Sequence, residues 1–174
     1  AGLPTDRVEV SALWPTWDDF IATGERYVEA SGKKFIDSAT NIFNPVLGQQ
    51  PVGFYDENET LQMAGGPKVA FDVAAKAIAS DLSANLVAFQ TDWNSGFVRG
   101  DFAVLACPAW MLGPIKNTAP DTEGKWDVAA VPGGGGNWGG SFLTVPSQGK
   151  NVDEAYKLLE WLVQPEQQIE IFKQ

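Results

Sequence analysis

The chain has 174 residues, no histidine, a single cysteine and a formal net charge of −10 at pH 7. Without histidine there is no Ser-His-Asp triad, no Cys-His dyad and no zinc site with an imidazole ligand, and one cysteine makes neither an intrachain disulfide nor a four-cysteine metal site. The excess of acidic residues argues against nucleic acid as a partner, because a polyphosphate binds a basic surface.

The composition predicts one globular domain over residues 1–174, for which no cofactor and no metal is expected. Hydrophobic residues make up 44% of the chain and charged residues 20%, which is enough apolar material for a core. No run approaches the roughly 18 apolar residues of a membrane span. The chain starts at Ala1 without an initiator Met or a signal-peptide pattern and stops inside an expected helix, so we expect a piece of a longer protein.

The first long helix is predicted to begin at Trp17 and to end at Ser31-Gly32-Lys33. Apolar residues recur there at helical spacing, and Thr16 with Asp19 three residues later approximates a capping box. Asp18 and Asp19 also suit the positive end of the helix dipole. Capping therefore explains these two carboxylates without a paired-carboxylate active site.

Helices and strands are expected to alternate along the rest of the chain. A continuous apolar run such as Phe102 to Ala106 suits a strand that is covered on both faces. Such alternation predicts an α/β layered fold, in which ligands gather at the carboxyl ends of strands. Further helices are expected at 41–49, 68–82, 93–99, 108–117, after Asn151 as an N-cap and from Pro165; strands or extended segments are expected at 35–38, 52–55, 102–106, 126–131 and 142–145.

Residues 132–141 form a glycine-rich run, Pro-Gly-Gly-Gly-Gly-Asn-Trp-Gly-Gly-Ser. A phosphate-binding loop would need a Lys-Ser/Thr pair and a helix after the glycines, and this run has neither. Two interpretations stay open. The run is either a flexible surface hairpin or a loop whose backbone N–H groups approach a ligand closely while Trp138 offers a flat apolar face.

The seven tryptophans divide by their sequence context. Trp17 and Trp161 lie on the apolar faces of expected helices, so they are predicted to pack in the core. Trp110, Trp138 and Trp93 lie at junctions beside Pro, Gly or Asn, where either packing or ligand contact is possible. Stacking suits a sugar, because one face of a pyranose ring presents C–H groups while its hydroxyls need polar partners.

Several segments, taken in order, resemble the bacterial extracellular solute-binding proteins of family 1, which serve sugar ABC importers. They cover essentially the whole chain. The segments are Ala1-Gly2-Leu3-Pro4-Thr5 followed by Trp14 to Phe20, Phe97 to Val104 followed by Cys107-Pro108-Ala109-Trp110, Trp126 to Pro132 followed by Gly139-Gly140-Ser141, and Ala155 to Leu162.

The resemblance implies one α/β lobe of a type II periplasmic-binding-protein-like fold, namely the C-terminal lobe without its N-terminal partner lobe. It further implies a sugar ligand held between two lobes, a membrane permease as a partner, and a location outside the cell, either as an anchored lipoprotein or in the periplasm. Trp110 would be the stacking platform, with Trp138 at the rim. The other residues implied in sugar binding are Gly139, Gly140, Ser141, Asp37, Thr40, Asn41, Phe43 and Asp92.

Two other classes of function stay open at this stage. A glycosidase would use two carboxylates roughly 5–10 Å apart, and acidic residues are plentiful, although no pair stands out at a strand end. A non-catalytic interaction domain would use its aromatic residues only for packing. Cys107 is expected to be a small buried thiol, because no base is present to activate it as a nucleophile.

Overall fold

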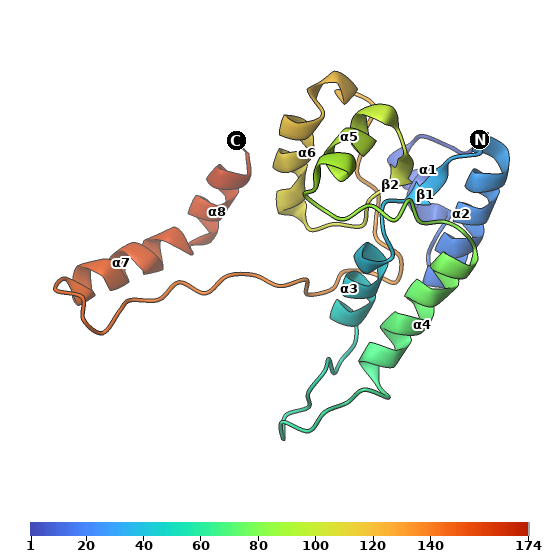
Figure 1. The fold of residues 1–174 in the computed structure, drawn as a ribbon. Coiled ribbons are helices and arrows are strands. Elements are labelled where there is room, and N and C mark those ends of the chain that lie inside the picture. Colours follow the sequence, from blue (N-terminus) through green and yellow to red (C-terminus); the bar gives the residue numbers. More distant parts are fainter. Residues whose placement is uncertain (174) are drawn as a thin grey trace. The chain divides into compact units, whose positions relative to one another are not determined.

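The computed structural model describes residues 1–173 and divides the chain into two units, Ala1–Trp138 and Gly139–Gln174 (Figure 1). The second unit holds α7 (Val152–Leu162) and α8 (Pro165–Phe172). The first unit holds α1 (Arg7–Ala12), α2 (Trp17–Ser31), β1 (Lys34–Ile36), α3 (Thr40–Gly48), α4 (Gly66–Ala79), α5 (Thr91–Arg99), β2 (Phe102–Val104), the 3₁₀ turn η1 (Ala109–Met111), α6 (Leu112–Thr118) and the 3₁₀ turn η2 (Pro120–Thr122).

The predicted first helix and its caps are confirmed. Thr16 Oγ1 accepts a hydrogen bond from the Asp19 N–H, and the Asp19 carboxylate accepts one from the Thr16 N–H, both at 3.2 Å. This capping box satisfies two backbone donors that the helix itself cannot pair. The helix ends at Gly32, whose φ of 68° is the left-handed conformation that favours glycine.

The sheet is small and parallel. Lys34 pairs with Phe102 and Ile36 with Val104, so β1 and β2 run side by side in the same direction (Figure 1). The segment after α4 also hydrogen-bonds along β1, since the Ala84 N–H donates to the Ile36 carbonyl at 2.9 Å. Both strands therefore end at the same edge, where an α/β fold usually binds its ligands.

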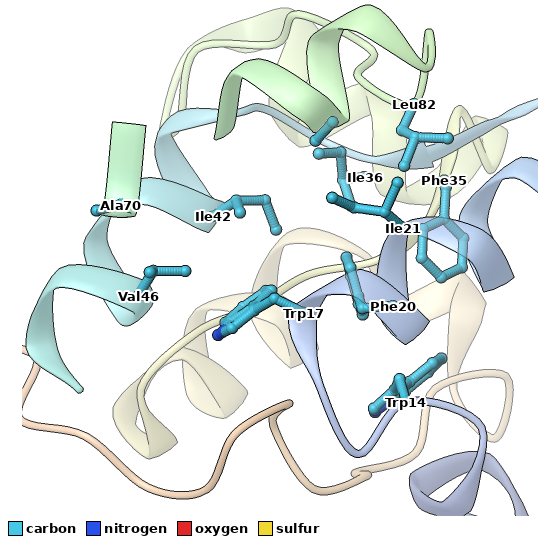
Figure 2. Packing of buried hydrophobic residues seen from close by; sticks show 11 residues of the cluster. Trp14, Trp17, Phe20, Ile21, Phe35, Ile36, Ile42, Val46, Ala70 and Leu82 are labelled. Atoms are coloured by element: carbon cyan, nitrogen blue, oxygen red, sulfur yellow. The ribbon is translucent and has the colours of Figure 1, made fainter. Parts of the chain in front are cut away.

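The main core lies between the sheet and helices α2, α3 and α4 (Figure 2). Phe20 and Phe35 are each 2% exposed and their rings lie 4.9 Å apart, with Trp14 and Trp17 edge-on around them. The prediction that Trp17 packs in the core is confirmed, because only 9% of its surface is exposed. Aromatic pairs of this geometry add stability beyond the area that they bury.

A second cluster gathers around α5, β2 and η1. Its buried members are Trp93, Phe97, Phe102, Met111 and Ala119, and Trp126 packs edge-on against Phe97 at 5.4 Å between ring centroids. Trp93, at 1% exposed, confirms the packing interpretation for that residue. The cluster holds η1 and α5 against β2, next to the edge at which the strands end.

The predicted strand at 126–131 is wrong. The segment is extended without a strand partner, because side chains rather than a neighbouring strand satisfy its backbone. Ala130 accepts a hydrogen bond from Trp14 Nε1 at 2.8 Å, and its N–H donates to Ser11 Oγ at 2.9 Å. Its apolar residues, Ala129 and Val131, still pack against the main core.

The other expected extended segments and the second expected strand differ in how far they are paired. Residues 52–55 and 142–145, expected to be extended, belong to no named strand, and residues 52–55 contribute one isolated bridge, between Tyr55 and Leu61. β2 stops at Val104 instead of continuing to residue 106. The pairing partner explains the last difference, because β1 has no residue beyond Ile36 in the ladder.

The helix boundaries differ from expectation mainly at their ends. α4 ends at Ala79 rather than at residue 82, and Asp81 then adopts a left-handed φ of 55°. Asn151 is the N-cap of α7, as expected, but its side chain makes no capping hydrogen bond. Pro165 begins α8 in its first turn, as predicted.

The expectation that Trp161 packs in a core is also wrong. Trp161 is 49% exposed, and neither α7 nor α8 buries a side chain in the described part of the chain. The second unit, taken by itself, has only two short helices among its described residues, and these cannot enclose a residue of this size. Within residues 1–173, no helix has both the length and the apolar character that crossing a bilayer requires.

Candidate ligand-binding site

The candidate site is built around the carboxyl ends of β1 and β2. Asp37 follows β1 directly, and Asn41 lies one helical turn further on, in the first turn of α3. Trp110 lies in η1, shortly after β2. The alternation of strands and helices thus brings residues that are far apart in sequence to one end of the sheet.

Asp37 is completely buried and joins two elements. Its Oδ2 accepts hydrogen bonds from Trp93 Nε1 at 2.7 Å and from Asn41 Nδ2 at 2.6 Å. Its carbonyl also accepts from the Leu86 N–H at 3.0 Å. The second carboxylate oxygen, Oδ1, has no hydrogen-bond partner, which is rare for a buried polar atom.

Burial changes the ionisation of this region. Desolvation raises the pKa of Asp37 from 3.8 to about 6, because the charged carboxylate loses its hydration; the hydrogen bonds from Trp93 and Asn41 oppose this effect. Desolvation, aided by the nearby charge of Asp37, raises the pKa of Cys107 to about 11. The thiol is therefore protonated at neutral pH and a poor nucleophile, as expected from the sequence.

A line of aromatic rings leads from Asp37 to Trp110. Buried Trp93, which donates to Asp37, contacts Phe89 with a centroid distance of 5.3 Å. Phe89 in turn lies nearly parallel to Trp110, with an interplanar angle of 13° and centroids 6.4 Å apart. Phe89 and Trp110 are 57% and 58% exposed, so this line begins in the core and ends at the surface.

The remaining predicted residues of α3 and α5 are less closely connected. Thr40 is exposed at the start of α3, and Phe43 is half-buried against the main core, 6.5 Å from the ring of Phe54. Asp92 is exposed in the first turn of α5, where its carbonyl accepts a hydrogen bond from Arg99 Nη2 at 3.4 Å. None of the three contacts Asp37 through a hydrogen bond in the described structure.

The first part of the glycine-rich run is anchored rather than free. Gln49, the residue after α3, donates from Nε2 to the carbonyls of Pro132 and Gly134 at 2.7 and 2.6 Å. Its Oε1 accepts from Trp17 Nε1 at 2.8 Å. A Cβ at Gly136 would come within 2.9 Å of the Gln49 side chain, so this close approach requires glycine.

The second part of the run contains the other predicted binding residues. Trp138 is half-buried at the end of the first unit, after Asn137 donates its N–H to the Gly48 carbonyl at 3.0 Å. Gly139, Gly140 and Ser141 begin the second unit, where all three are exposed.

Two residues of this region were not anticipated from the sequence, Phe89 and Gln49. Phe89 stands in a polar, irregular segment, and Gln49 looks like an ordinary helix end. Only their tertiary partners single them out, so neither hydrophobic spacing nor a motif would have found them.

Three carboxylates outside this region have structural roles. Asp19 caps α2, Asp18 forms an exposed ion pair with Lys76 at 2.9 Å, and Asp56 accepts hydrogen bonds from the Asn58 and Thr60 N–H groups at 2.9 Å. In the part of the chain that the structure describes, no group of three or more Cys, Asp or Glu side chains is placed to hold a metal ion.

The sequence profile of the bacterial extracellular solute-binding proteins matches residues 5–174. The chain therefore belongs to the bacterial extracellular solute-binding protein family, and its α/β fold is that of one lobe of a periplasmic-binding-protein-like protein. A crystal structure of an extracellular solute-binding protein of family 1 is 41% identical, with a TM-score of 0.86 over 99% of this chain and 45% of that one.

Two further relatives carry more specific names. The arabinooligosaccharide-binding protein of Bacillus subtilis is 27% identical over 157 residues, 83% of this chain and 36% of that protein. An ABC transporter associated binding protein from B. animalis subsp. lactis, solved with β-1,6-galactobiose, is 26% identical with a TM-score of 0.67, over 88% of this chain and 41% of that one. These names describe binding proteins rather than enzymes, and the chain spans less than half the length of each relative.

Proposed function

We propose that this chain is the C-terminal lobe of a two-lobed protein that binds an oligosaccharide and delivers it to an ABC importer. The observation that carries the proposal is Trp110, a large indole that is 58% exposed at the carboxyl end of the parallel sheet. A sugar ring stacks its C–H face on such an indole, which explains why so large an apolar surface is left in contact with water. The oligosaccharide ligands named for relatives of this chain support the same class of ligand.

In this proposal the predicted residues divide into contact and support roles. In the first unit, Trp110 stacks on the sugar, with Trp138 at the rim of the site. In the second unit, taken by itself, the backbone and hydroxyl groups of Gly139, Gly140 and Ser141 are proposed as hydrogen-bond donors to a sugar. Asp37 and Asn41 lie in the hydrogen-bonded network behind the platform. Thr40, Phe43 and Asp92 are proposed as further contacts at the edge of the site.

We infer that the protein binds its sugar without chemically changing it. Asp37 is the only predicted site carboxylate that is buried, and it accepts its side-chain hydrogen bonds from Trp93 and Asn41 rather than pairing with a second acid. A glycosidase needs two carboxylates that face one bond of the substrate. Release of reducing sugar from an oligosaccharide by the purified protein would contradict this inference.

The N-terminal partner lobe, the permease and an extracellular or periplasmic location, with or without a lipid anchor, belong to the same proposal. A binding protein that supplies an importer works outside the cytoplasmic membrane, and the family of this chain is described as extracellular. A second lobe that closes over the first would bury most of the ligand, as small-molecule sites generally do.

The test compares the full-length protein with its Trp110→Ala variant by calorimetric titration with arabinotriose and β-1,6-galactobiose. Loss of one stacking face costs about 1–3 kcal/mol by analogy with stacked bases, so the variant is expected to bind at least about fivefold more weakly. Phe71→Ala, which removes a 65% exposed ring from α4, serves as the matched control and keeps full affinity. Unchanged binding by the Trp110→Ala variant would overturn the assigned role.

A further inference from the structure

The side-chain amide of Asn41 has only one orientation that its partners allow. Its Nδ2 donates to Asp37 Oδ2 at 2.6 Å, and the indole N–H of Trp93 donates to the same oxygen at 2.7 Å. An indole N–H only donates, so Oδ2 is the accepting oxygen of Asp37. The group of Asn41 that faces this oxygen is therefore its NH2 group, and the carbonyl oxygen of the amide, Oδ1, is turned away from Asp37.

The charge of Asp37 keeps the amide in this orientation at neutral pH. Burial raises the pKa of Asp37 to about 6, so the ionised carboxylate is the main form at pH 7. An ionised carboxylate has no proton to donate, so it could not bond to Asn41 Oδ1 if the amide turned over. Turning over would instead bring two acceptor oxygens together in a buried network, which is costly.

Asn41 Oδ1 is available to a donor from outside the chain. Asn41 is half-buried, and within residues 1–173 its Oδ1 makes no hydrogen bond. Among these residues, Asp37 Oδ1 is the buried side-chain atom that lacks a partner, so Asn41 Oδ1 is reached by solvent. Asn41 lies in the first turn of α3, just after the end of β1, at the edge where α/β folds bind their ligands.

Helix formation does not account for an asparagine at this position. Asparagine is a poor helix former, and near the start of a helix its side chain favours capping the backbone. The N-cap of α3 is Ala39, which makes no side-chain capping bond, and the amide of Asn41 bonds to Asp37 instead. The need of a buried carboxylate for a donor explains the NH2 group of Asn41, but it gives the outward oxygen no role.

We propose that Asn41 is a specificity-determining residue that accepts a hydrogen bond from a sugar hydroxyl, and that Asp37 is a positioning residue that holds the Asn41 amide with its oxygen toward the ligand. This inference rests on the proposed sugar-binding function and deepens it. An outward oxygen favours a ligand group that donates a hydrogen bond over one that only accepts. Fluorine in place of a hydroxyl distinguishes the two, because it is of similar size and has no proton to donate.

The variants separate the outward oxygen from the buried network. Asn41→Leu removes the amide and keeps its approximate size. Asp37→Leu removes the acceptor that orients the amide, whereas Asp37→Asn is the conservative variant, because its carbonyl oxygen still accepts from Trp93 and Asn41. Asn117→Leu, at an exposed position of α6, is the matched control. If thermal melting shows that Asp37→Leu is unfolded, Asp37→Ser takes its place, since its shorter side chain does not reach Asn41.

The full-length wild type is titrated calorimetrically with arabinotriose and β-1,6-galactobiose, and every variant with the tighter of the two and with derivatives in which fluorine replaces one hydroxyl. For the wild type we expect at least one derivative to bind about three- to tenfold more weakly than the parent sugar, the range for one lost hydrogen bond. In Asn41→Leu the ratio of the two affinities should fall below about twofold.

The same ratio reports the positioning role of Asp37. In Asp37→Leu it should also fall below about twofold, because the unrestrained amide can turn its NH2 group toward the fluorine. Asp37→Asn and Asn117→Leu are expected to keep the ratio of the wild type. A purely structural role of Asp37 would lower the affinities for the sugar and its derivative by the same factor and leave the ratio unchanged.

Failure of the inference and failure of the proposed function give different results. If the wild type binds sugar but Asn41→Leu keeps the ratio for every derivative, the function stands and the contact by Asn41 is overturned. An unchanged ratio in Asp37→Leu or its serine replacement, or a lost ratio in Asp37→Asn, overturns the positioning role of Asp37. If the wild type binds neither sugar, the proposed function fails, and the inference fails with it.

Discussion

At the scale of single residues, Asp37 is a buried carboxylate whose pKa is shifted by its surroundings. It is 0% exposed, accepts two side-chain hydrogen bonds on one oxygen and leaves the other oxygen unpaired. A buried carboxylate is costly in its charged form, and here the hydrogen bonds only partly offset that cost. The stability of the fold therefore depends on whether the Asp37 carboxyl group is protonated.

Stability is expected to fall as the pH rises through the range in which Asp37 ionises. The folded-state pKa of about 6 lies above the value of 3.8 for a free carboxyl, so between these values the folded state holds the proton that the unfolded state has lost. The difference corresponds to roughly 3 kcal/mol. The free energies of unfolding of the wild type and of Asp37→Asn can be measured in urea at several pH values. From about pH 4 to pH 7, the stability of the wild type relative to the variant is expected to decrease by roughly this amount.

Asp56 provides a control with the opposite sign. Hydrogen bonds from the Thr60 and Asn58 N–H groups lower its pKa, so its contribution is present above the free value of 3.8 and is lost on acidification. Asp56→Asn should thus lose its difference from the wild type as the pH falls below about 4. If the difference in the free energy of unfolding between the wild type and Asp37→Asn did not change across the same pH range, the ionisation assigned to Asp37 would be contradicted.

At the scale of elements, α2 contains a residue of low helix propensity, Gly24, at a position where close packing requires it. Gly24 lies in the middle of the helix, where glycine costs roughly 1 kcal/mol relative to alanine. A Cβ at this position would come within 2.6 Å of the Phe35 ring and 2.8 Å of a Leu82 methyl group. Glycine is therefore required because α2 lies close against the sheet.

Gly24→Ala is expected to destabilise the protein by about 1–3 kcal/mol, because overpacking outweighs the gain in helix propensity. Ala22 lies two residues away on the exposed side of the same helix. Ala22→Gly measures propensity alone and should cost about 0.5–1 kcal/mol. Denaturant unfolding of both variants checks the comparison, and a more stable Gly24→Ala variant would show that the contact between α2 and the sheet is looser than described.

At the scale of the whole first unit, long-range hydrogen bonds from side chains take the place of a further strand. Trp14 and Ser11 hold Ala130, while Gln49 connects Trp17 to the carbonyl of Pro132. These contacts join the beginning of the unit to its end. The exposed ion pair between Arg7 and Asp127 adds little, because water screens it.

Gln49→Ala is expected to lower the free energy of unfolding by about 1.5–4.5 kcal/mol, since three hydrogen bonds are lost at about 0.5–1.5 kcal/mol each. The neighbouring Gln50→Ala removes one bond, to the Val46 carbonyl, and should cost correspondingly less. Hydrogen exchange should speed up at the Gly133 and Asn137 amides in the first variant. Equal effects of the two variants would count against an anchored glycine run.

Much of the local structure could be predicted from local sequence. Thr16 and Asp19 fixed the start of α2, apolar spacing defined its buried face, and Pro165 marked the first turn of α8. Segment order was enough to indicate the family. The strand at 126–131 was predicted wrongly, because its run of apolar residues indicates burial but does not reveal whether a strand or a set of side chains pairs its backbone.

The sequence by itself determined the caps of α2, the α/β class and the family, because these depend on neighbouring residues and on their order. Only the tertiary structure decided that Gln49 anchors the glycine run, that Asp37 is buried beside Trp93, and that Phe89 lies parallel to Trp110. Such contacts join residues far apart in the chain, and hydrophobic burial is non-directional, so no local pattern specifies which side chains meet.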